Sequence, residues 1–480
     1  MKIFYYIFSI LIIRFPYLID SEKILFAWQI HRHGARAPYN GIINNSDIYK
    51  EHWLEKEELT NVGKRMLYLL GVKARKRYII QTKLLSKQYS PQEILIRSTD
   101  VNRTIESVES FLQGLYPIGT GPVIKDFLAN NKNISYPPNK LYTESFEQII
   151  QYYNLNSNNN YALPFQMTII PIHLFYKPYH EFELYNTNIC KGHLEIYEKQ
   201  KARDEIKKFR EKLFSRFPDV FEYLEGTKDE KILYDYWSLY KYADTFLVDD
   251  IDKRNFNFLK DKFNFTQEDF ETLKNYSKEF LLMDYSDTNF PKSHPEITIM
   301  VLSYTMHSLI NWMEKAKIGN KQNNTYIKYV VYSAHDASIG ALEYFMEYAF
   351  NISGEFAELA DSRFFEFYLD DDNNYRIRYM KGNSLIPKLD ITFDYFKKVI
   401  NEITWSDEKV DEYCKFNDGN ENKENNNKKI PILFISMLFL AIINGILLLI
   451  LIILIFKKLY KCLYFFDNLN LYKIYLITKS

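Results

Sequence analysis

Short apolar runs alternate with helix-like patterns over much of this 480-residue chain. Residues 23–30, 94–96 and 326–334 read as buried strands. Helical patterns follow the second run to about Leu115 and the third to about Phe350. Strand-helix alternation of this kind is typical of α/β folds, which place ligands at the carboxyl edge of the sheet. We therefore predict an α/β sheet core.

Two further regions have different patterns. Segments 364–369 and 375–379 flank an Asp-Asp-Asp-Asn-Asn stretch and predict a late hairpin. Residues 145–300, by contrast, are rich in charged helical patterns. The strand-helix alternation lies outside this stretch, in residues 22–145 and 300–410, which we expect to form the core of one domain spanning 22–414.

Both ends of the chain carry membrane signals. Residues 3–13 are apolar and follow Lys2, which predicts a signal peptide over 1–20, with an uncleaved anchor as the alternative. Residues 430–456 contain no charge and are long enough for a transmembrane helix. The tail 457–480 holds five lysines and one aspartate, a net charge of +4, which favours the cytosolic side and a type I topology. Polar residues 415–429 read as a stalk.

A cluster of histidine and arginine residues directly follows the first predicted strand, in residues 31–38, His-Arg-His-Gly-Ala-Arg-Ala-Pro. Guanidinium forks match phosphate oxygens, so Arg32 and Arg36 can neutralise a phosphoryl group. His33 then becomes a candidate nucleophile, while Gly34 permits close backbone approach. A basic surface turn with incidental histidines is the alternative interpretation.

These residues resemble the Arg-His-Gly-x-Arg-x-Pro signature of the histidine acid phosphatases, the second branch of the histidine phosphatase superfamily, and among them the membrane-anchored lysosomal and prostatic types. Three further segments resemble elements of the same family. They are Leu59-Thr-Asn-Val-Gly63, in which Thr60 can cap a helix, Arg97-Ser-Thr-Asp100, in which Asp100 can cap the next helix, and His335-Asp336.

The resemblance implies a role for each matching side chain. His33 would attack phosphorus and form a phosphohistidine, and Asp336 would protonate the leaving alcohol. Because a protonated carboxyl group is scarce at neutral pH, activity should favour acid conditions. Phosphate would be held by four side chains: Arg32, Arg36, Arg97 and His335. The resemblance requires no metal or other cofactor, and it implies a mainly helical cap inserted within 145–300 and helices on both faces of the sheet.

Composition and cysteine usage indicate which partners and which cellular compartment to expect. The 61 basic and 61 acidic residues balance, which argues against a nucleic-acid partner. If Cys462 is cytosolic, Cys190 and Cys414 are the pair left in an oxidising compartment, and the family resemblance is compatible with a disulfide between them. N-glycosylation sequons agree with a luminal domain and occur at Asn44, Asn102, Asn133, Asn264, Asn275, Asn323 and Asn351.

The leading hypothesis is a membrane-anchored acid phosphatase that hydrolyses small phosphate monoesters in a lysosome-like or endosome-like lumen, or at the cell surface. A specialised phosphatase for inositol polyphosphates or lysophosphatidic acid is the first alternative. A catalytically inactive, receptor-like ectodomain is the second. The lipid bilayer is an expected partner through residues 430–456, and the sequence leaves open whether the protein is a monomer or a homodimer.

Overall fold

The computed structural model describes residues 22–38, 57–125, 161–175, 190–192, 296–355, 357–382, 384 and 386–414, with scattered residues between 195 and 275. The predicted signal peptide 1–20, stalk 415–429, span 430–456 and tail 457–480 lie outside them, as does most of 145–300. Within the described residues, no helix is both long and apolar enough to cross a bilayer. The chain divides into two units, residues 1–414 and 415–480, and the catalytic motifs all belong to the first.

A seven-stranded mixed sheet forms the centre of the described part of the first unit, in the order β3-β2-β4-β1-β5-β6-β7. The first four strands in this order are parallel, and β5 to β7 are antiparallel to their neighbours. The strands are β1 (Lys23–Arg32), β2 (Ile94–Thr99), β3 (His173–Phe175), β4 (Tyr329–Ala334), β5 (Ser362–Leu369), β6 (Tyr375–Lys381) and β7 (Leu389–Thr392). The predicted hairpin is confirmed as β5 and β6, whereas β7 was not predicted.

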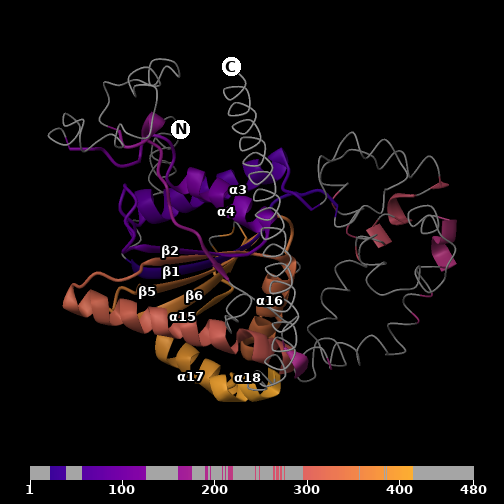
Figure 1. Ribbon diagram of the computed structural model, residues 1–480. Helices are drawn as coiled ribbons and strands as arrows, with labels where there is room; N and C mark the ends of the chain where they lie inside the picture. The colour runs from indigo at the N-terminus through magenta and orange to yellow at the C-terminus, as the bar shows by residue number, and fades with distance from the viewer. Residues whose placement is uncertain are drawn as a thin grey trace, which may run out of the picture. The chain divides into compact units, whose positions relative to one another are not determined.

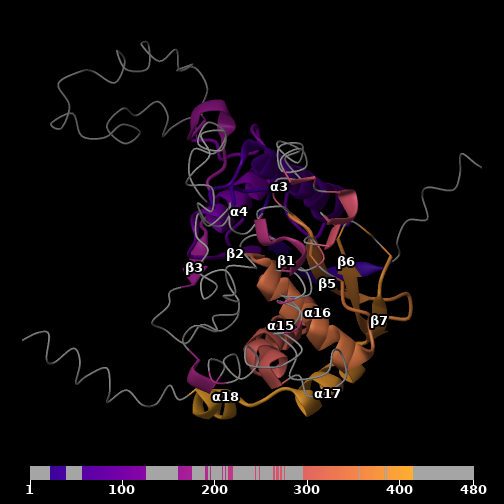
Figure 2. The same ribbon diagram turned by 90° about the vertical axis from the view of Figure 1, so that its right-hand side faces the viewer.

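Helices cover both faces of this sheet, and the predicted α/β core is confirmed. Figures 1 and 2 show α3 and α4 on one face and α15, α17 and α18 on the other. The helical segments are α3 (Asn61–Ala74), the π-helix η1 (Arg75–Gln81), α4 (Asn102–Leu115), the 3₁₀ turn η3 (Pro164–Gln166), α15 (Glu296–Gln322), α16 (Asp336–Phe350), α17 (Phe393–Ile403) and α18 (Asp407–Cys414).

The position of β1 explains how the motifs meet. Nine of its ten residues are buried, as expected for a central strand, and it pairs in parallel with β4. In this register Arg32 lies opposite Ala334, so both strands end at the same edge of the sheet. The segments that follow them, starting at His33 and at His335, therefore leave the sheet side by side.

Helices α3 and α4 pack closely because each has a glycine at their contact. A Cβ atom on Gly71 would lie 1.9 Å from the carbonyl oxygen of Phe111, and one on Gly114 would lie 2.1 Å from that of Tyr68. Bulkier residues at either glycine would force the helices apart.

The two predicted helix caps have different outcomes. The Thr60 hydroxyl accepts a hydrogen bond from the Gly63 amide at 3.1 Å, which confirms Thr60 as the cap of α3. The prediction that Asp100 caps α4 was wrong. The N-cap is Val101, whose carbonyl accepts from the amides of Thr104 and Ile105, and no side chain caps this helix.

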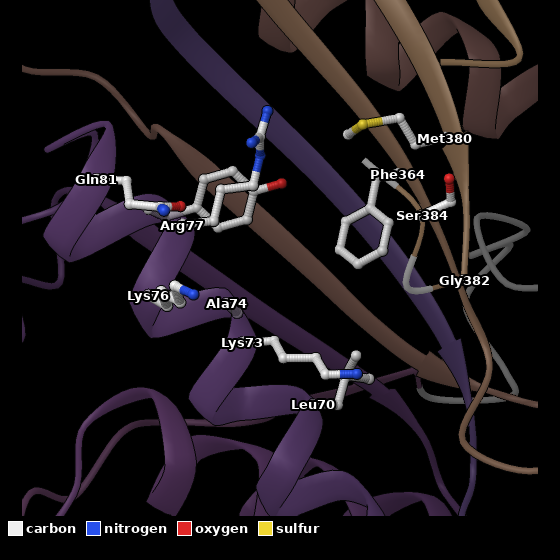
Figure 3. A pocket seen from close by; sticks show the side chains of 11 residues that line it. Leu70, Lys73, Ala74, Lys76, Arg77, Gln81, Phe364, Met380, Gly382 and Ser384 are labelled. Atoms are coloured by element: carbon white, nitrogen blue, oxygen red, sulfur yellow. The ribbon is translucent and has the colours of Figure 1, made fainter. Parts of the chain in front are cut away.

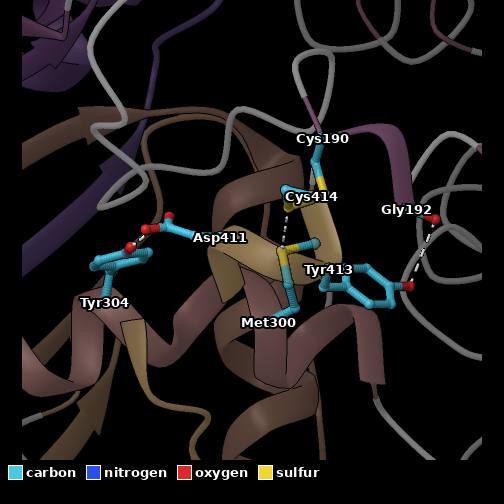
Figure 4. Close-up of a disulfide and its surroundings, with 7 residues drawn as sticks. All are labelled: Cys190, Gly192, Met300, Tyr304, Asp411, Tyr413 and Cys414. Carbon is cyan, nitrogen blue, oxygen red and sulfur yellow. Dashed lines mark hydrogen bonds between the residues drawn. A yellow bond between two sulfur atoms is a disulfide. The ribbon is translucent and has the colours of Figure 1, made fainter. Parts of the chain in front are cut away.

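A disulfide joins Cys190 to Cys414, 224 residues apart, at the end of α18 (Figure 4). The sulfur of Met300 lies 3.7 Å from that of Cys414, and the Tyr413 hydroxyl donates to the carbonyl of Gly192 at 3.5 Å. Closing so long a loop stabilises a fold by roughly 4 to 5 kcal/mol in the chain-entropy model. The bond thus fixes the end of the first unit to a segment from the middle of the chain.

Candidate active site

His33 is buried directly beyond β1, and its ring orientation leaves one nitrogen available as a nucleophile. Its Nδ1 lies 2.9 Å from the carbonyl oxygen of Gly34. A carbonyl only accepts hydrogen bonds, so Nδ1 carries the proton in the neutral ring and Nε2 keeps its lone pair. This is the tautomer that attack through Nε2 requires.

The charge state of His33 also suits a nucleophile. Burial, followed by the positive charges of Arg32, Arg36 and Arg103, holds the pKa of His33 well below its ordinary value of 6.5. The imidazole therefore stays neutral in mildly acid solution, where an ordinary histidine would be protonated and unable to attack.

Tight backbone packing holds the loop that carries His33. A Cβ atom on Gly34 would lie 2.5 Å from the carbonyl oxygen of Gly63, so the loop can rest on α3 only if glycine occupies this position. The Gly34 amide donates to the Ser107 hydroxyl at 3.1 Å, which links the same loop to α4. The expectation of close backbone approach at Gly34 is thus confirmed.

Asp336 is the first residue of α16 and pairs with the arginine that precedes His33. Its Oδ2 lies 2.6 Å from Nη2 of Arg32, and its Oδ1 accepts from the Ala337 amide at 2.8 Å. Burial alone would raise the pKa of Asp336, but Arg32 above all holds it below its ordinary value of 3.8. The free site therefore contains an ionised Asp336, and its protonated form is scarcer than that of an isolated carboxyl group.

His335 lies beside His33, with ring centroids 5.7 Å apart. Its Nε2 is 3.0 Å from the hydroxyl of Thr99, at the end of β2. Burial and the charge of Arg103 lower the pKa of His335 to about 3, against the opposing effect of Asp336. His335 is thus a neutral, oriented hydrogen-bonding group.

Arg36 makes an ion pair that the sequence did not predict. Its guanidinium donates to both carboxylate oxygens of Asp244, at 3.0 and 2.8 Å, and both side chains are buried. Asp244 belongs to the stretch 145–300, far from the motifs in sequence. No local pattern distinguishes it from the other acidic residues of that stretch, so only the folded structure reveals the pairing.

Arg103, in the first turn of α4, is the second residue that sequence reasoning missed. Its charge lowers the pKa of both His33 and His335, and its Nη1 donates to Glu57 at 2.8 Å. Its Nε is buried and has no hydrogen-bond partner among the described residues. A buried donor of this kind suits an anionic ligand. Its position at the start of the helix that follows β2 could have identified Arg103 as a site residue from the sequence.

Arg97, the predicted third phosphate-binding arginine, lies in β2, the strand that precedes α4. It is half-buried in β2, opposite Tyr332 of β4, two residues before Thr99. Thr99 in turn contacts His335. Its phosphate-binding role stays a prediction, and Arg103 is a further candidate for that role because its charge acts on both His33 and His335.

The remaining described histidines lie in other settings. The ring of His31 stacks on Phe111 in the core, His173 is exposed on the edge strand β3, and His307 contacts Thr404 at 2.9 Å. Within the described part of the chain, no three His, Cys, Asp or Glu side chains come together as a metal-binding group.

The site combines a neutral imidazole with clustered guanidinium groups and a carboxyl group at the carboxyl edge of the sheet. Such an arrangement suits phosphoryl transfer, in which positive charge stabilises the equatorial oxygens. Residues 23–380 match the family model described as histidine phosphatase superfamily (branch 2). The chain belongs to this family and is a phosphatase.

Individual relatives agree with this membership. The chain is 27% identical to the lysosomal acid phosphatase of Xenopus laevis over 375 residues, which cover 76% of this chain and 71% of the relative. It is 36% identical to the human lysophosphatidic acid phosphatase type 6 over 81 residues, 17% of this chain and 19% of the relative. The phytase structure from Citrobacter braakii matches with a TM-score of 0.50 at 12% identity, over 82% of this chain and 99% of that one, and so shares the fold.

Replacing Arg103 with Gln should weaken inhibition by phosphate or vanadate about ten- to a hundredfold, because a charge-assisted hydrogen bond to the anion is lost. Replacing Arg97 with Gln should change the inhibition constants by less than about threefold. Steady-state inhibition of nitrophenyl phosphate hydrolysis measures both. A larger effect of the Arg97 substitution than of the Arg103 substitution would favour Arg97 as the phosphate-binding residue.

Proposed function

We propose that this protein hydrolyses phosphate monoesters through a phosphohistidine on His33. One observation carries the proposal: the buried His33 keeps its Nε2 lone pair and lies among arginine charges, next to His335 and Asp336. The family resemblance assigned these roles, and we add Arg103 to the proposed phosphate-binding residues because its charge acts on both His33 and His335.

In the first step, Nε2 of His33 attacks phosphorus, and the bond from phosphorus to the ester oxygen breaks. An alkoxide is a poor leaving group, so Asp336 transfers its proton to that oxygen and the product leaves as a neutral alcohol. Arg32, Arg36 and Arg103 stabilise the charge on the transferred phosphoryl group.

In the second step, water attacks phosphorus and the bond between phosphorus and Nε2 breaks. Asp336, now a carboxylate, accepts a proton from the water. Inorganic phosphate then leaves, and His33 returns to its neutral form. A bound phosphate also changes the state of Asp336, because a dianion on Arg32 weakens the ion pair that holds the pKa of Asp336 low. Substrate binding thus helps to supply the catalytic proton.

The ion pair between Arg36 and Asp244 gives Arg36 a fixed orientation before substrate binds. A bidentate contact holds the guanidinium plane, and Asp244 offsets the cost of burying its charge. We infer that Asp244 is a positioning residue for the phosphate-binding side chain of Arg36.

A second part of the proposal concerns which phosphate ester the enzyme hydrolyses. A general acid phosphatase is favoured because the relative with the long alignment, from Xenopus laevis, is a lysosomal acid phosphatase. The similarity to lysophosphatidic acid phosphatases is local, and the phytase likeness concerns the fold alone. An inactive, receptor-like ectodomain is disfavoured, since a protein without turnover has no need of a buried cluster of cations around an imidazole.

We further propose that residues 430–456 anchor a luminal enzyme, lysosomal or at the cell surface, as a type I membrane protein with a signal peptide over 1–20. The proposal rests on the uncharged stretch, the basic tail and the sequons. The disulfide between Cys190 and Cys414 agrees with an oxidising compartment. The domain limits 22–414, the helical cap within 145–300 and the stalk 415–429 belong to the same proposal.

Replacing His33 with Ala should reduce turnover on the order of a million-fold, as for other covalent nucleophiles, and remove the acid-labile phosphoenzyme. Rapid quenching after mixing with ³²P-labelled substrate measures the phosphoenzyme directly. The variant His31→Asn is a suitable comparison, because the buried ring of His31 stacks on Phe111 and the variant should retain the phosphoenzyme. Undiminished labelling of His33→Ala would contradict the assignment.

Replacing Asp336 with Asn should slow hydrolysis of an alkyl phosphate about 10²- to 10⁴-fold and that of nitrophenyl phosphate much less, because nitrophenolate leaves without protonation. In the unchanged enzyme, kcat/KM for the alkyl ester should fall as pH rises, since the pKa of Asp336 is below its ordinary value and the protonated form becomes scarce. Asp336→Asn should lose this dependence. Asp372→Asn, in the exposed hairpin turn, serves as a control, and equal rate losses for both esters would exclude Asp336 as general acid.

The topology can be checked with an impermeant maleimide on sealed vesicles that contain the full chain. Cys462 should react from the cytosolic side, and Cys462→Ser should abolish the signal. Cys190 and Cys414 should react only after permeabilisation and reduction. Free thiols at both positions without reduction, or a protected Cys462, would contradict the proposed arrangement.

A further inference from the structure

Apart from the catalytic site, a cavity of about 250 Å³ lies between the helical segment α3–η1 and the β5–β6 hairpin. None of the catalytic side chains lines it. Figure 3 shows its two sides facing each other, with helix residues opposite Phe364, Met380 and Ser384. Its apolar walls are formed by Leu70, Ala74, Tyr78, Phe364 and Met380. A concave site with apolar walls and a few polar groups at its mouth is the usual form of a small-molecule site.

All the charged side chains that line this cavity are basic. Lys73 and Lys76 lie along its rim, are exposed, and make no hydrogen bond or ion pair with the described residues. Arg77, which also lines the cavity, is different because both oxygens of the buried Glu366 hold its guanidinium. The two ammonium groups therefore remain uncompensated within the described structure, next to the apolar walls.

We propose that this cavity binds a single-chain amphiphile with an anionic head group, of the fatty-acid class. The aliphatic chain occupies the apolar interior, where its burial supplies the main driving force. The carboxylate remains at the rim, where Lys73 and Lys76 attract it and water still solvates it. The volume accommodates one chain or part of one, and the positive rim selects an anion over a neutral or cationic amphiphile.

This ligand is distinct from the phosphate ester at His33. The catalytic site is lined by buried guanidinium and imidazole groups that suit a small dianion, whereas this cavity combines apolar walls with lysines. The proposal therefore does not depend on turnover, and the two can fail separately.

Photolabelling of the full-length protein with a diazirine derivative of dodecanoic acid tests the proposal. Labelled peptides identified by mass spectrometry should contain Tyr78, Phe364 or Met380. The double variant Lys73→Gln/Lys76→Gln should raise the half-saturating concentration about tenfold. Lys87→Gln, which removes an exposed lysine outside the cavity, should leave it unchanged.

Three results would overturn the proposal. They are labelling mainly outside the cavity, equal half-saturation for the double variant and Lys87→Gln, and equal labelling by a dodecylamine probe of the same length. Hydrolysis of nitrophenyl phosphate and the unfolding temperature establish that each variant is folded. If the double variant does not fold, Ser384→Trp at the exposed mouth provides the same test, since it should block labelling without altering turnover.

Discussion

The active site depends on collecting positive charge around a buried imidazole without destabilising the fold. Guanidinium groups are expensive to bury unless carboxylates compensate them. Each arginine of the cluster has such a partner: Arg32 pairs with Asp336, Arg36 with Asp244 and Arg103 with Glu57. In the proposed mechanism the carboxylates keep the cations oriented for a phosphate dianion, and one of them, Asp336, also transfers the proton. Stability of the free enzyme and affinity for phosphate are thus in direct competition at Arg32.

The same strategy stabilises the scaffold on which the site is built. Glu343 of α16 is buried and binds Arg363 of β5 and Lys381 of β6, and it accepts a hydrogen bond from Tyr379. Because α16 begins at Asp336, this cluster holds the helix that carries Asp336 on the β5–β6 hairpin. On the opposite face, Glu366 joins Arg77 and Tyr78 of η1 to the same hairpin. Each buried carboxylate therefore links a helical segment to the sheet.

Sequence reasoning predicted the parts of the site that directly follow strands. Both motifs come directly after apolar runs, so the parallel pairing of β1 and β4 was enough to place His33 near His335. The hairpin was also evident, from alternating residues around a polar turn. Asp244 was not predictable, because its pairing with Arg36 is set by tertiary structure across 208 residues.

The wrong helix cap near β2 has a physical reason as well. Asp100 has the side chain expected of a cap, but α4 begins one residue later and Val101 has that position. Arg97 and Arg103 lie on the two sides of this boundary, and the sequence alone does not show that the charge of Arg103 acts on both histidines. Element boundaries are the least certain product of sequence patterns.

The ion pair between Arg36 and Asp244 spans 208 residues, so we expect the catalytic centre to form late in folding. Its two residues belong to distant parts of the chain, and the central pairing of β1 with β4 likewise joins residues about 300 positions apart, for example Gln29 and Val331. Contacts of such long range form slowly, because loop entropy is lost before they stabilise the chain. During synthesis, the motif containing His33 emerges well before Asp244 and β4. We therefore expect activity to appear only after nearly the whole first unit has been made, so the proposed phosphohistidine would not form on incomplete chains.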